Sequence, residues 1–149
     1  MAGMEGLGRV FNIVGTASGV AINMSACSGV TFYGTNDGTY SLTASKTFGS
    51  GYTATPVASW APIHNVYYNT DNGAGTGKWV KDTVVNAAAY TQSSDYAIAF
   101  TIFGSEFPDG YTWVKCTKTT DNDGNPSCMA LLHDLTVQRT PANLPAVSA

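Results

Sequence analysis

The feature that most constrains the fold is a series of short runs in which apolar and polar residues alternate. Each run ends in Gly, Asn or Asp, and the runs recur at intervals of roughly ten residues. Alternation with a period of two is typical of half-buried strands, and this spacing favours a β-sandwich or barrel over βαβ units. The predicted strands span residues 9–14, 20–24, 30–33, 39–45, 65–69, 78–84, 96–103, 111–118 and 129–139.

Composition supports the same class. Leu, Glu, Gln, Lys and Arg together number 17, whereas Thr alone numbers 19, so good helix formers are scarce. Only residues 57–60 and 84–90 are expected to wind a helical turn or two. The length of 149 residues is that of a typical single domain. We therefore predict one all-β domain over residues 1–149, an antiparallel β-sandwich or barrel-like fold with extended N- and C-terminal segments, including a proline-containing tail at about 140–149.

The charge pattern excludes several partners. Charged residues make up 11% of the chain and the net charge is −3, and the basic residues cluster no further than Lys78/Lys81 and Lys115/Lys118. A nucleic-acid partner is therefore not expected. Glu5 occupies the region where a signal peptide carries positive charge, and polar residues interrupt the apolar stretch that follows. We expect neither a secretion signal nor a membrane partner, and synthesis in the cytoplasm.

Local patterns predict how some strands are placed. The turn residues 36–38 (Asn-Asp-Gly) predict a tight hairpin between the strands that flank them. Residues 108–110 (Pro-Asp-Gly) predict a second turn, and residues 69–77 form a glycine-rich loop. The segment 78–84 has mixed faces, which is typical of an edge strand. By contrast, 96–103 is apolar on both faces, which predicts a central strand covered by the second sheet and, on its other face, by a neighbouring subunit.

The sequence shows no recognisable set of catalytic residues. His133 and Asp134 are adjacent on a predicted strand, so they point to opposite faces and cannot act as base and orienter. His64 follows a proline at a strand start, which favours a structural role. Glu106 and Asp109 flank a turn and are expected to lack a nearby histidine or basic partner. The protein is predicted not to be an enzyme.

Metal and cofactor motifs are incomplete. Asp121, Asp123 and Asn125 occupy alternate positions of a calcium loop, but Pro126 and Leu132 stand where glycine and a bidentate glutamate are needed. The glycine loop before Lys78 lacks the spacing of a phosphate-binding loop. No metal and no cofactor are expected. The eight tyrosines and three tryptophans are interpreted as core residues rather than as a sugar or base platform.

The three cysteines leave two alternatives open. Cys116 and Cys128 flank a predicted hairpin loop, so they could face each other across two antiparallel strands at disulfide distance. They could equally be two small buried thiols in a reducing cytosol, with a bond forming only after release to an oxidising medium. Cys27 is expected to be a buried thiol.

Several segments resemble a known class of proteins. These are VFNIVGTASGVAINMSACSGVTFYGTNDGTYSLTAS, the run HNVYYNT before a glycine loop and tryptophan, PDGYTWVKCT, and above all the ending HDLTVQRTPANLP. The chain resembles the small virion proteins of tailed phages that infect actinobacteria, commonly regarded as capsid decoration or minor capsid proteins. The resemblance implies a non-enzymatic protein that binds the exterior of the assembled capsid and stabilises it, with the major capsid protein as partner.

The resemblance also implies an assembly. Decoration proteins in general are trimers, so a homotrimer at a three-fold position of the capsid surface is expected. Low charge favours burial against a partner surface, as protein interfaces are depleted in charge. The two ends of the chain are the predicted capsid or subunit contacts: Val10, Phe11, Ile13, Val14, Arg139 and Leu144.

Two alternative functions remain open, and each would show a feature of its own. A tail-tube or other virion structural protein would share the β fold and form rings. A carbohydrate-binding β-sandwich would need an exposed row of aromatic residues or a coplanar set of Tyr and Trp.

Overall fold

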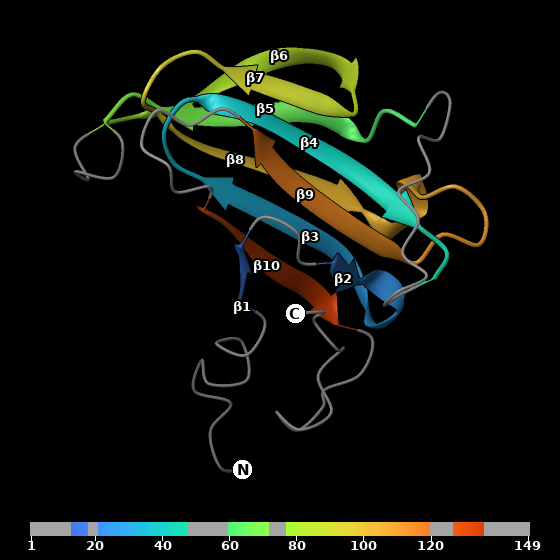
Figure 1. Ribbon diagram of the computed structural model, residues 1–149. Helices are drawn as coiled ribbons and strands as arrows, with labels where there is room; N and C mark the ends of the chain where they lie inside the picture. The colour runs from blue at the N-terminus through green and yellow to red at the C-terminus, as the bar shows by residue number, and fades with distance from the viewer. Residues whose placement is uncertain (1–12, 18–20, 48–59, 72–76, 120–126, 136–149) are drawn as a thin grey trace, which may run out of the picture.

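The computed structural model describes residues 13–17, 21–47, 60–71, 77–119 and 127–135 (Figure 1). They form ten strands and two short 3-10 helices, η1 and η3, and no α-helix occurs in these ranges. The elements are β1 (Ile13–Ala17), β2 (Ala21–Asn23), η1 (Met24–Ala26), β3 (Cys27–Gly34), β4 (Gly38–Ser45), β5 (Ile63–Asn69), β6 (Trp79–Ala87), β7 (Ala89–Gln92), β8 (Ala97–Phe103), η3 (Gly104–Glu106), β9 (Trp113–Thr119) and β10 (Ser127–Leu135).

Two antiparallel sheets pack face to face, so the predicted all-β sandwich is confirmed (Figure 1). One sheet has six strands in the order β1-β10-β3-β8-β5-β6, and the other has four in the order β2-β9-β4-β7. Without β5 and β6, the two orders are those of an eight-stranded jelly roll. Its consecutive strands alternate between the sheets, except that β4 and β7 lie side by side in the same sheet. β5 and β6 extend the first sheet beyond the edge strand of that motif.

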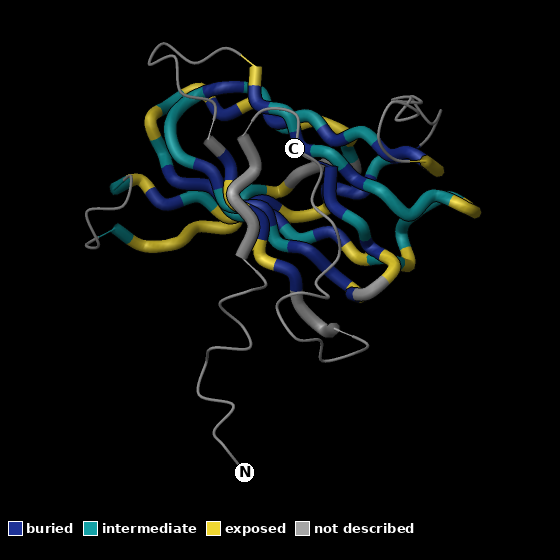
Figure 2. Tube along the Cα trace, turned by 60° about the horizontal axis from the view of Figure 1, so that its bottom comes forward, coloured by how far each residue is buried: buried dark blue, intermediate teal, exposed yellow. Residues whose placement is uncertain are grey.

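Buried and more exposed residues alternate along the strands (Figure 2). The buried residues of both sheets point toward each other and form the core between them. Phe100 of β8 lies at the centre, with its ring 5.5 Å from that of Phe32 on β3 and 6.4 Å from that of Tyr40 on β4. The three aromatic rings therefore join the two sheets. Only glycine fits at position 34, because a Cβ there would collide with the Tyr40 ring. Other large core residues are Ile22, Met24, Val30, Leu42, Trp60, Ile63, Val66, Ile98, Ile102, Val114 and Leu132.

The strand placements predicted from the edge and central patterns are confirmed. β6 is an edge strand, and β8 lies between β3 and β5 inside the six-stranded sheet. A single residue, Ala88, separates β6 from β7, and its carbonyl accepts a hydrogen bond from the Leu42 amide (2.8 Å). The chain thus crosses from one sheet edge directly to the edge of the other. This crossing limits the exposed strand edge, which is an aggregation hazard in open sandwiches.

The predicted hairpin at residues 36–38 is wrong, although the turn is present. Asn36 and Gly38 have positive φ angles of 68° and 143°, as such a turn requires. However, β3 pairs with β10 and β8, whereas β4 pairs with β9 and β7. The turn carries the chain from one sheet to the other, because the apolar faces of β3 and β4 must oppose each other across the core.

Of the other local predictions, one is wrong and one is confirmed. The segment 84–90, expected to wind a helical turn, is strand on both sides of Ala88. Pairing with the neighbouring strands overrides its alanine-rich local propensity. The turn near Pro108 is confirmed, with the Tyr111 amide donating to the Pro108 carbonyl (3.0 Å) and Gly110 at φ 79°. Pro108 holds the first of the four turn positions rather than the second, which proline usually favours. Residues 57–59, the glycine loop at 72–76 and the expected tail lie outside the described residues.

Candidate functional site: two contrasting sheet faces

The outer face of the six-stranded sheet carries a cluster of exposed apolar side chains, beside the hydrogen-bonded hydroxyls of Thr31 and Thr101. Here "apolar face" means the exposed large side chains named below, each 44–49% accessible, together with Tyr33 and Ala99 between them. Its central row runs across four strands in register: Met129 pairs with Tyr33, Tyr33 with Ala99, and Ala99 with Tyr67. The exposed large members are Tyr67, Trp79, Phe103, Met129 and Leu131.

Lys81 lies at one end of the apolar face. Tyr67 pairs with Lys81 on the edge strand β6, and Lys81 is the one charged residue at outward positions whose side chain the structure describes on this sheet. Aromatic residues and methionine are enriched in protein interfaces, and charged residues are depleted at their centres. The apolar face has this composition.

The outer face of the four-stranded sheet is different in kind. Its outward positions are mainly hydroxyl residues, paired in register across β7, β4 and β9: Thr39 with both Thr91 and Thr119, and Ser41 with Thr117. The Thr39 and Thr91 hydroxyls are 3.0 Å apart and hydrogen-bonded. We call this the hydroxyl face. Its hydroxyls hydrogen-bond within the sheet, and exposed hydroxyls can also bond to solvent, so this face needs no protein partner to cover it.

Sequence reasoning missed the apolar face. It assigned the aromatic residues to the core, which is right for Tyr40 and Trp60 and wrong for the exposed Tyr67 and Trp79. The available signal was strand parity, since Tyr67 and Ala99 alternate with the buried Val66 and Phe100. The face is not a flat aromatic platform, because the rings of Tyr33 and Trp79 meet at 61° with centroids 6.4 Å apart.

The predicted terminal contacts are only partly described. Ile13 and Val14 belong to β1, which pairs with β10 through Ile13–Leu131 and Val14–Ala130, so their backbone extends the sheet beside the apolar face. Their side chains, and Val10, Phe11, Arg139 and Leu144 as a whole, lie outside the described residues. The calcium-like run at 121–125 lies outside them too. His133 and Asp134 lie on β10, and their side chains are not described.

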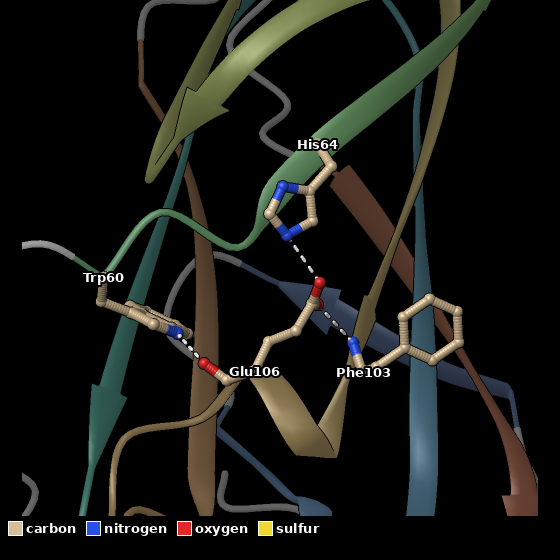
Figure 3. Close-up of polar contacts among 4 residues, drawn as sticks. All are labelled: Trp60, His64, Phe103 and Glu106. Atoms are coloured by element: carbon tan, nitrogen blue, oxygen red, sulfur yellow. Dashed lines mark hydrogen bonds and ion pairs between the residues drawn. The ribbon is translucent and has the colours of Figure 1, made fainter.

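Glu106 has a partner that its sequence neighbourhood hid. Its carboxylate lies 2.6 Å from Nε2 of His64 and accepts a hydrogen bond from the Phe103 amide (2.8 Å), while its carbonyl accepts one from Trp60 Nε1 (3.0 Å) (Figure 3). The expectation that Glu106 lacks a nearby histidine is therefore wrong. The contact joins residues 42 positions apart in the chain, which no local motif indicates. Both carboxylate oxygens hold structural groups, so Glu106 ties the start of β5 to the end of β8.

The cysteines meet in a different way from the one predicted. Cys116 lies on β9 in the four-stranded sheet and Cys128 on β10 in the six-stranded sheet, so they do not face each other across a hairpin. Both are buried free thiols that approach across the core. A hydrogen bond to Cys128, together with burial, raises the pKa of Cys116 well above its usual value. Burial raises the pKa of Cys27 to about 11.

These thiols should be unreactive in the folded protein. The thiolate is the reacting form, and the raised pKa values of Cys27 and Cys116 leave almost none of it at pH 8, while burial shields Cys128 from reagents. We expect iodoacetamide at pH 8 to label none of the three cysteines in the native protein and all three after unfolding in guanidinium, as counted by intact-mass spectrometry. Rapid native labelling, or only one accessible thiol after unfolding without reductant, would contradict the buried free-thiol arrangement.

No group of three His, Cys, Asp or Glu side chains is placed to hold a metal ion within the ranges that the structure covers. In the same ranges, no helix is long and apolar enough to cross a membrane.

Comparison with known proteins gives no relative: no family model, no curated protein and no solved structure matches this chain.

Proposed function

We propose that this chain is a non-enzymatic structural protein of a phage virion that binds the exterior of the assembled capsid and stabilises it. The observation that carries the proposal is the contrast between the two outer faces. Aromatic and aliphatic side chains in register across four strands form a surface suited to a protein partner, and the opposite face is suited to solvent. Exposed apolar patches of this kind mark interaction sites.

Other features support the virion assignment. The ending HDLTVQRTPANLP resembles small virion proteins of actinobacterial phages, and the jelly-roll strand order recurs in viral capsid domains. A fold alone does not decide function, so the face and the resemblance carry the argument together. The partners in this proposal are the major capsid protein and two further copies of the chain in a homotrimer.

The chain stabilises the capsid in this proposal through contacts that form only on the assembled shell. Each copy that seats its apolar face against neighbouring subunits adds contacts that must break before the shell opens. By linkage, a ligand of the assembled state raises the stability of that state over its parts. The chain needs no catalytic group or cofactor for this role.

Removal of the protein tests the proposal. We expect particles lacking it to lose their DNA at lower temperature and in lower salt than complete particles, because the added contacts are gone. The measurement is DNA release against temperature, with purified protein added back as the control that should restore resistance. Equally robust particles, or a protein found inside the shell or in the tail, would contradict the decoration role and favour another virion structural role.

A further inference from the structure

The sandwich has a polar pocket of about 290 Å³ on the side where the sheet edges meet. It lies where β5 and β6 extend beyond the four-stranded sheet and the chain crosses into β7. Its lining includes three tyrosines, a carboxylate, an amide and a hydroxyl: Tyr68, Tyr90, Tyr96, Asp82, Gln92 and Ser94.

The pocket combines a fixed aromatic wall with polar groups. The rings of Tyr68 and Tyr96 stack at 13° with centroids 5.7 Å apart, which holds both rings in place. Tyr90 Oη donates a hydrogen bond to Asp82 Oδ2 (2.9 Å), and that bond does not use the second carboxylate oxygen. Burial and this bond raise the pKa of Tyr90 to about 12, so its hydroxyl stays protonated at neutral pH.

Gln92 is an unusual member of the lining. It is 7% exposed, and its side-chain nitrogen is buried without a hydrogen-bond partner. A buried amide nitrogen without a hydrogen-bond partner destabilises the fold. The last side-chain torsion of glutamine is soft, so a modest rotation can turn the amide toward a pocket ligand that offers an acceptor.

From these groups we infer that the pocket is a binding site for a neutral sugar. The C–H groups of a sugar ring carry partial positive charge and pack on the negative face of an aromatic ring, while its hydroxyls both donate and accept hydrogen bonds. Asp82 and the absence of any basic residue in the lining disfavour phosphates and carboxylates. The polar lining disfavours lipids, and the volume lies at the lower end for ligand pockets, which suits one sugar ring.

The site can operate while the apolar face is covered. Successive residues of a strand point to opposite faces, so Lys81 lies on the side of the apolar face and Asp82 on the side of the pocket. The inference therefore does not depend on the proposed capsid role, and a particle-bound copy would keep the pocket for saccharides of a bacterial surface.

Titration of the full-length protein with neutral sugars tests the site. The probes are glucose, galactose, mannose and N-acetylglucosamine, followed by NMR and calorimetry. We expect at least one to bind with a dissociation constant on the order of 1 mM. Asp82→Asn should weaken that binding at least tenfold, while Tyr90 can still donate to the new amide oxygen. Asp95→Asn is the matched control, with the same loss of charge at an exposed residue outside the lining, and should bind as the unmodified protein does.

A second variant separates binding from folding. Gln92→Leu should abolish sugar binding without lowering the free energy of unfolding, because it removes an amide nitrogen that is buried without a hydrogen-bond partner. If none of the four sugars binds, or if Asp82→Asn and Asp95→Asn bind alike, the sugar site is refuted. Because the isolated chain is used, this result is independent of whether particles need the protein for stability.

Discussion

Two carboxylates placed on the apolar face, Tyr67→Glu together with Met129→Glu, are expected to abolish binding to the capsid. Both side chains are nearly half exposed in the chain alone, so the folded protein should tolerate the change. On the shell they would become buried charges without partners, which cost several kcal/mol. We expect at least a 100-fold loss of affinity, about 2.7 kcal/mol. The measurement is co-sedimentation of purified protein with particles that lack it.

The hydroxyl face supplies the matched control. Thr119→Glu adds one carboxylate, half the charge of the double variant, at an exposed residue of the four-stranded sheet and should leave co-sedimentation unchanged. A double variant that binds normally, or a Thr119→Glu protein that does not bind, would show that the wrong face has been assigned.

Phe100→Ala is the second large effect, and it acts on the fold. Phe100 is 1% exposed and contacts the rings of Phe32 and Tyr40, so its removal leaves a cavity where the two sheets meet. Truncation of a buried phenylalanine costs about 3–5 kcal/mol, a large part of the roughly 5–15 kcal/mol that holds a domain folded. Denaturant unfolding followed by tryptophan fluorescence measures the loss.

Phe103→Ala on the same strand is the control for that experiment. Phe103 is 46% exposed and its side chain lies on the apolar face, so its removal should change the free energy of unfolding by less than about 1 kcal/mol. Equal losses for the two variants would contradict the inward and outward assignment of β8.

Strand alternation was enough to predict the class of fold and most strands. The pattern of residues 96–103 also predicted a central strand, because a segment apolar on both faces must be covered on both. What alternation cannot show is which strands pair. The turn at 36–38 has the residues of a hairpin, and the same residues serve equally well to carry a chain across a sandwich.

The candidate surfaces were harder to predict for the same reason. Met129, Tyr33, Ala99 and Tyr67 form one row only because four strands from distant parts of the chain align in register. The contact between His64 and Glu106 is likewise created by the fold. A sequence shows which residue types are present and how many of each there are, but it does not show which of them the fold brings together.

The measurement that tests the central claim most directly is a cryo-EM reconstruction of virions that carry this chain. The account predicts copies on the outer surface of the shell, with the face of Tyr67 and Met129 buried against neighbouring subunits and the threonines of the hydroxyl face in solvent. Copies inside the shell or in the tail, or copies seated with the hydroxyl face inward and Tyr67 and Met129 exposed, would contradict it.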